Sequence, residues 1–192
     1  MEQYNSFVLV RFQIIVLLAS LSLWGCGPLH ITPTEIQVDS PKDRLLEGVS
    51  IALKNAETDS AEYNMIFMQN RNDTSVRTNK RQCIDMIVKG LNKGLDDRGA
   101  RITEESSFVV SMAMQEIAYE NIVGVWKCYS TVNVAVGSTW KRKYQGQGAA
   151  SSWGVGPVKT FTSALNRSFS DVVTLILTGE EFLSVLKAGE RQ

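Results

Sequence analysis

The chain has 192 residues, with 20 Lys plus Arg, 20 Asp plus Glu and 44% hydrophobic residues. A formal net charge of zero argues against a strongly basic nucleic-acid binder and against an acidic disordered tail. The three cysteines and one histidine are too few for a closed zinc framework, which needs four Cys or His ligands at tight spacing. The length suits one domain of ordinary size.

The N-terminal residues 1–25 have the pattern of a bacterial secretion signal. Arg11 is a lone positive charge ahead of an apolar run from Phe12 to Trp24. A helix of that run would be roughly 20 Å long, which is short for a bilayer core of about 30 Å. The run ends at Leu23, Trp24, Gly25 and Cys26, an order that resembles a lipobox, in which an aliphatic and a small residue precede the cysteine.

This pattern predicts cleavage after Gly25 and lipidation of Cys26, with Leu23 and Gly25 recognised by the signal peptidase. Trp24 departs from the pattern because a smaller residue is usual there. An uncleaved anchor helix and an ordinary signal peptide remain as alternatives. Several acyl chains would hold the protein firmly at a membrane, because each buried CH₂ contributes about 0.8 kcal/mol.

Residues 26–46 are interpreted as the lipidated cysteine and a tether that holds the domain clear of the membrane. Three prolines, at 28, 33 and 41, exclude a helix in this segment. Ile31, Ile36 and Val38 could pair as an edge strand or lie along the domain. His30 is expected to be exposed to solvent and to bind no metal.

Residues 47–188 are predicted to form a single domain. A strand is expected over 49–54, a short buried strand over 65–68, and an antiparallel meander over 108–147, since apolar residues alternate in these stretches. Helical spacing of apolar residues predicts helices over 80–95 and 158–177 and a short terminal helix over 180–188. Gly90 and Gly94 lie four residues apart, which suggests tight packing on the sheet or a close-approach surface for a partner.

The expected fold is therefore α+β, a two-layer sandwich with two main helices on one face of a mostly antiparallel sheet of about four strands. The element order is β-(β)-α-β-β-β-α. Two amphipathic helices bury their apolar stripes most simply on the same face of a sheet. The other face is then open to water or to a partner.

A lipobox followed by this order of elements resembles the YajG-like family of small bacterial envelope lipoproteins. The resemblance rests on Gly48-Val49-Ser50-Ile51, on the segment from Leu91 to Gly99, on Phe108-Val109-Val110-Ser111 and on Phe182-Leu183. It implies an anchored lipoprotein, and it carries over no catalytic residue. By resemblance to enterobacterial lipoproteins, Gly27 after the lipidation site favours the outer membrane, with the domain facing the periplasm.

The sequence has no pattern that favours catalysis. The carboxylate pairs are adjacent in sequence and so point in different directions, and the glycines of 146–156 lack the Lys-Ser/Thr of a phosphate loop. No catalytic residue, metal site or cofactor beyond the covalent lipid is expected. Cys83 and Cys128 could form a disulfide in an oxidising compartment, although two buried free thiols are the favoured reading.

The expected partner surface is the open sheet face together with the small-residue loop 146–157. Its candidate residues are Trp140, Arg142, Tyr144 and Trp153. The sequence thus predicts a non-enzymatic lipoprotein whose domain binds or positions an envelope protein or a peptidoglycan-associated component, and no nucleic acid. A lipoprotein that binds a small lipid or glycan is the alternative.

Overall fold

A computed structural model describes residues 28–58, 60–68 and 75–189. The signal sequence, Leu23, Gly25 and the predicted lipidation site Cys26 lie outside these residues. The elements are β1 (Leu29–His30), β2 (Ser50–Asn55), β3 (Glu62–Asn64), β4 (Ile66–Phe67), β5 (Val76–Asn79), α2 (Lys80–Asp97), β6 (Arg101–Ile102), β7 (Val109–Ile122), β8 (Val125–Val136), β9 (Trp140–Ser151), α3 (Pro157–Thr178) and α4 (Glu180–Gly189).

The fold is α+β, as the sequence predicts, but the sheet is larger and mixed. Six strands form the main sheet, in the order β6-β2-β7-β8-β9, with β4 also paired to β7. The meander β7-β8-β9 is antiparallel, whereas β2, β4 and β6 pair in parallel with their neighbours. The expectation of about four mostly antiparallel strands is corrected, because strands of only two residues give no periodic signal in a sequence.

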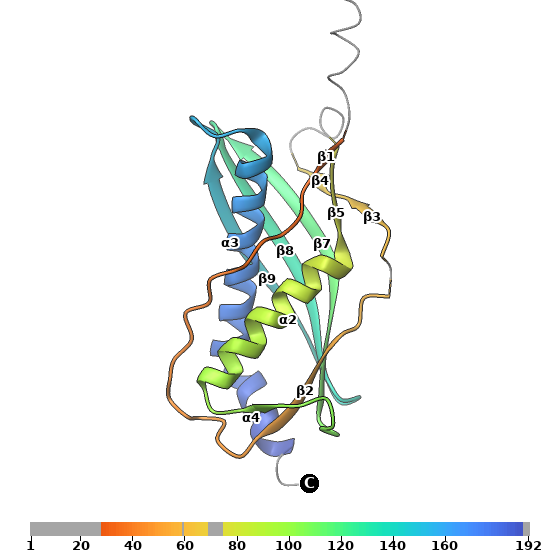
Figure 1. Ribbon diagram of the computed structural model, residues 1–192, viewed down its shortest axis with the longest axis vertical. Helices are drawn as coiled ribbons and strands as arrows, with labels where there is room; N and C mark the ends of the chain where they lie inside the picture. Colours follow the sequence, from red (N-terminus) through yellow and green to blue (C-terminus); the bar gives the residue numbers. More distant parts are fainter. Residues whose placement is uncertain (1–27, 59, 69–74, 190–192) are drawn as a thin grey trace, which may run out of the picture.

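Helices α2 and α3 lie on the same face of the main sheet (Figure 1). Their apolar stripes and the inward residues of β7, β8 and β9 form one buried core. Alternate residues of β8, among them Cys128, Val132 and Val134, are completely buried, whereas their neighbours are only half-buried. This alternation shows that one sheet face is covered, whereas no described element covers the other.

The segment between Leu29 and Leu46 packs along the helices, which corrects its interpretation as a tether that holds the domain clear of the membrane. Ile31, Ile36, Val38 and Leu46 are buried in the core. A Cβ on Gly90 would lie 2.5 Å from Ile36 Cδ1, so this glycine makes room for the segment on α2. We call residues 29–46 the N-terminal strap.

Gly94 has a similar role toward α3. A Cβ at this position would lie 2.2 Å from Leu177 Cδ1, within the contact between α2 and α3. The two glycines of α2 therefore admit the strap and α3. The strap and α3, rather than the sheet, therefore lie against these two glycines.

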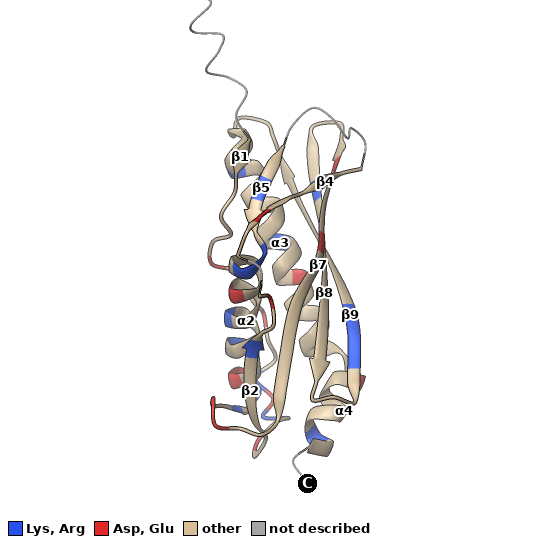
Figure 2. Ribbon diagram, turned by 90° about the vertical axis from the view of Figure 1, so that its right-hand side faces the viewer, with Lys and Arg blue, Asp and Glu red and all other residues tan. Residues whose placement is uncertain are grey.

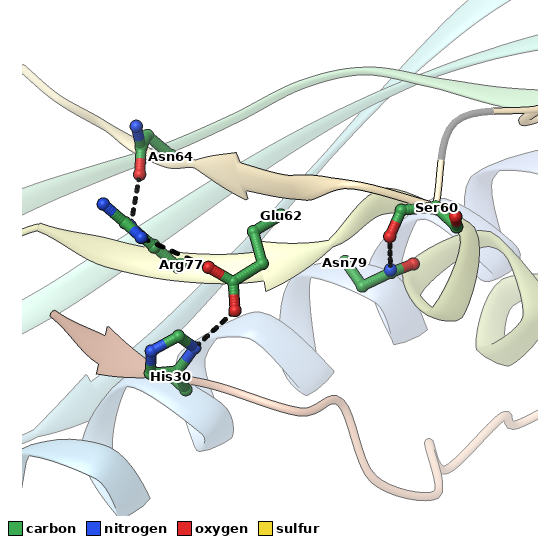
Figure 3. A network of polar contacts seen from close by, with 6 residues as sticks. All are labelled: His30, Ser60, Glu62, Asn64, Arg77 and Asn79. Carbon is green, nitrogen blue, oxygen red and sulfur yellow. Dashed lines mark hydrogen bonds and ion pairs between the residues drawn. The ribbon is translucent and has the colours of Figure 1, made fainter.

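A second sheet has three strands in the order β1-β5-β3. Its strand β1 is the first part of the strap. Its polar side chains form a surface network: His30 Nδ1 lies 2.9 Å from Glu62 Oε1, and Glu62 also pairs with Arg77 (Figure 3). Asn79 ends β5 and caps α2 by accepting a hydrogen bond from the Gln82 backbone N–H at 3.0 Å. His30 is exposed, as expected, and its contact holds the strap to the small sheet.

Candidate functional site

The candidate residues of β9 lie on the covered face of the sheet, which corrects the predicted partner surface. Trp140 packs against Phe182 of α4, with ring centroids 5.8 Å apart, and Tyr144 is 7% exposed. Arg142 forms an ion pair with Glu181 of α4. Trp153 alone is strongly exposed, at 80%, and it lies in the β9–α3 loop. The four residues therefore do not form one surface.

The expected small-residue loop is also shorter than 146–157, because Gly146 to Ser151 form the second half of β9. Here α3 lies directly on the strand: a Cβ on Gly146 would lie 2.3 Å from Ser168 O, and one on Gly148 would lie 2.1 Å from Ala164 O. The side chains of α3 also cover the outer edge of β9. Asp171 accepts a hydrogen bond from Gln147 N at 2.8 Å, and Arg167 donates one to Ala149 O.

The open face of the main sheet carries the residues that alternate with the core positions. On β9 these are Lys141, Lys143 and Gln145, all exposed. Register places Lys141 beside Ala135, Lys143 beside Asn133 and Gln145 beside Thr131 of β8. Figure 2 shows this part of β9 in blue, the colour of Lys and Arg. The odd-numbered residues of β9, rather than the aromatic even-numbered ones, thus face outward.

Asn133 is a missed residue in the middle of this face. Its Oδ1 atom is buried and has no hydrogen-bond partner among the described residues. A buried carbonyl oxygen without a partner costs roughly 1–3 kcal/mol. Its weak signal in the sequence is an amide residue within the apolar alternation of β8.

A separate depression of about 510 Å³ lies between β9, the end of α3 and the start of α4. Its lining includes Arg142, Tyr144, Gly179 and Glu181. The Tyr144 hydroxyl is buried beside Gly179 and has no partner among the described residues. Burial is the main cause that raises the pKa of Tyr144, so its hydroxyl keeps its proton at neutral pH.

The two described cysteines are buried free thiols, as the sequence favours. Burial raises the pKa of Cys83 to about 12 and that of Cys128 to about 11. Cys83 lies 3.4 Å from the Thr78 hydroxyl, and Cys128 lies near Ser130 and Ser168. Protonated thiols inside a core are poor nucleophiles. These cysteines therefore serve as core side chains.

Among the described residues, no three His, Cys, Asp or Glu side chains gather as ligands of one metal ion would. No described helix has both the length and the apolar content needed to cross a membrane.

Comparisons with known proteins place the fold but not the function. No family model and no curated protein matches the sequence. The chain is similar in structure to a Xanthomonas campestris protein of the DUF330 family, with a TM-score of 0.57 and 10% sequence identity over 83% of this chain and 98% of that one. A candidate lipoprotein from Caulobacter crescentus has a TM-score of 0.47 and 10% identity over 77% of this chain and 96% of that one. The first match shows a shared fold, and the YajG-like resemblance stays a prediction.

Proposed function

We propose that this protein is a non-enzymatic envelope lipoprotein, anchored through Cys26, whose domain binds another envelope component through the open face of β7, β8 and β9. The observation that carries the proposal is this uncovered face, which has a buried, unpartnered Asn133 oxygen at its centre. The lipobox-like order of Leu23, Gly25 and Cys26 supports the anchor. Attachment to the outer membrane and a place in the YajG-like family belong to the same proposal.

The chemistry of the open face favours a protein partner over a lipid. Half-buried polar residues, Asn133 and Thr131, lie at its centre, and the exposed amines of Lys141 and Lys143 lie beside them. Glu116 and Glu120 lie on the β7 side, opposite Thr131 and Lys127. A face with a positive side, a polar centre and a negative side suits a partner of complementary charge.

The test uses a photo-crosslinking amino acid at Thr131 of the full chain in its native membrane. We expect one discrete partner to be captured, and Lys141→Glu with Lys143→Glu to reduce that capture strongly. The matched control is Lys89→Glu with Lys93→Glu, which removes the same number of exposed amines from α2. Equal capture by both double variants, or capture of abundant proteins only, would count against the proposal.

Small-ligand binding is a second candidate, favoured by the unpartnered Tyr144 hydroxyl beside the 510 Å³ depression. A volume of this size lies within the usual range of ligand pockets. Native mass spectrometry of the full chain should then show a bound small molecule that Tyr144→Phe weakens. Identical spectra for both chains would exclude this site.

A further inference from the structure

Exposed apolar side chains gather at one end of the molecule, the end at which β7 turns into β8 and β9 leads into α3. Val123 in the β7–β8 turn is 91% exposed, and Trp153 in the β9–α3 loop is 80% exposed. The two loops are neighbours, because Ser152 N and Oγ both donate to Gly124 O. We call this group the apolar tip: Ile66, Met68, Ile122, Val123, Trp153, Val155 and Val158, each at least 39% exposed.

The remaining members belong to the same end. Met68 follows β4, and its N–H donates to Tyr119 O at 2.9 Å, a few residues before the β7–β8 turn. Val158 opens α3 directly after the Trp153 loop. Beneath the tip, Phe67, Tyr119, Trp126 and Phe161 form an aromatic cluster with ring centroids 4.7–6.1 Å apart. The exposed side chains therefore project from a rigid base.

The strap begins at this same end. Leu29 N donates to Ser75 O, Met65 N donates to Val76 O, and β4 then pairs with β7 at Ala118 and Tyr119. Figure 1 shows β1, β4 and the β7–β8 turn together at the top of the molecule. Cys26 precedes Leu29 by three residues, which span at most about 11 Å. A lipid on Cys26 would therefore hold the apolar tip at the membrane.

The opposite end of the sheet has a different composition. The β8–β9 turn there is Gly137, Ser138 and Thr139, and the loop before β7 carries Glu104 and Glu105. The β7–β8 turn, in contrast, holds Val123 at φ 48°. A β-branched residue in this left-handed region is strained, and Asn or Gly is usual in such a hairpin turn. Of the nine large apolar side chains that are exposed among the described residues, only Leu45 and Leu175 lie outside the apolar tip.

We infer that the apolar tip enters the lipid bilayer surface beside the acylated N-terminus. The inference rests on the proposed lipid anchor at Cys26. Branched aliphatic side chains would lie among the upper acyl chains, about 5–10 Å deep, and the Trp153 indole would lie at the headgroups, where tryptophan is enriched. Lys159, exposed in the first turn of α3, would meet anionic headgroups. The domain would then contact the membrane through its tip, and its open sheet face would stay accessible to a partner.

The test places a fluorescent label at the tip of the full chain, purified from membranes and reconstituted in phosphatidylethanolamine–phosphatidylglycerol vesicles. Val123→Cys is labelled at the tip, with Val155→Cys as a second tip site in case the first variant does not fold. Ser138→Cys is the matched control, because it lies in the other turn of β8, about 40 Å away at 3.3 Å per residue. Cys83 and Cys128 are buried and do not compete for the label.

We expect nitroxide-bearing lipids to quench the tip labels at least about twofold more than the Ser138 label, as shallow insertion requires. The same samples are analysed for vesicle flotation and for acylation of Cys26. If an acylated, floating chain shows equal quenching at both ends, the tip inference is wrong and the lipid anchor stands. If the chain is unacylated and does not float, the lipid anchor fails, and the inference fails with it.

Discussion

Gly146 and Gly148 decide how closely α3 approaches the sheet. Their missing side chains let the backbone of α3 lie on β9, where Ser168 O and Ala164 O would otherwise meet a Cβ. Helix backbone cannot move aside as the end of a flexible side chain can. The contact also brings the Ser168 hydroxyl within 2.7 Å of the Ser130 hydroxyl in the core.

We predict that Gly148→Ala lowers the free energy of unfolding by about 3 kcal/mol, because overpacking in a rigid core costs this order of energy. Chemical denaturation of the full chain measures the change. Gly156→Ala is the control, since a Cβ there meets no atom within 4 Å. Equal stability of the two variants would show that α3 does not lie on β9 as described.

Val123 provides a second test at the residue scale. We expect Val123→Asn to raise the free energy of unfolding by about 1 kcal/mol, because Asn tolerates the left-handed conformation that strains a β-branched residue. Val155→Asn, at an exposed valine of the same tip whose φ is not positive, should leave stability nearly unchanged. Thermal unfolding compares them, and a loss of stability in Val123→Asn would contradict the strain.

At the scale of elements, Arg98 ties three segments together. It follows α2, is 5% exposed, and its Nη2 lies 2.6 Å from Asp43 Oδ2 in the strap. The same guanidinium donates to Leu177 O near the end of α3. The strap, α2 and α3 are therefore joined at the end of the molecule opposite the apolar tip.

The ion pair between Arg98 and Asp43 predicts that the stability of the folded chain depends on pH. Hydrogen bonds from Arg98 are the first cause that lowers the pKa of Asp43 below its ordinary 3.8, so the folded state binds the Asp43 proton less readily than the unfolded state. The stabilisation is present above pH 3.8 and is lost as the pH falls through the lower folded pKa. Asp43→Asn should reduce stability at pH 7, and the difference from wild type should narrow as the pH falls below 3.8, as denaturation curves at pH 7 and at acidic pH would show. A difference that stays constant with pH would contradict the ion pair.

How far the sequence predicts each element depends on its length. The helices α2, α3 and α4 agree with expectation to within a few residues, because each spans several turns of apolar periodicity. The strand expected over 65–68 is present as β4, although Ile66 is exposed rather than buried. The two-residue strands β1 and β6 and the parallel pairings could not be predicted, since two residues contain no period and pairing is a tertiary property. In the strap, packing of Ile31, Ile36 and Val38 along the domain was one of two alternatives, and their burial confirms it. The sequence could not choose between that packing and an edge strand, because three apolar residues at irregular spacing fit both.

The candidate site was harder to predict than the fold, for a physical reason visible in β9. Alternation shows that Tyr144 and Lys143 face opposite ways, but it does not say which side is the core. Trp140 and Tyr144 are large apolar side chains and lie against α3 and α4, whereas the lysines face outward. The strong exposure of Trp153 agrees with its choice as a candidate, but it belongs to the tip rather than to the open face.

At the scale of the whole molecule, the two ends of the domain differ. One end carries the apolar tip and the start of the strap, and the long open face of β7, β8 and β9 extends away from it (Figures 1 and 2). A lipid anchor at Cys26 would place the tip at the membrane, so that the open face extends away from the membrane surface. The proposed orientation, and with it the proposed roles of the open face and of the tip, depend on acylation of Cys26.

The most direct measurement is therefore the intact mass and N-terminal peptide of the protein taken from its native membrane. We expect a mature chain that begins at Cys26 and carries diacylglycerol on its sulfur. A full, unacylated chain of 192 residues would contradict the proposed lipid anchor, because attachment would then have to come from uncleaved residues before Cys26.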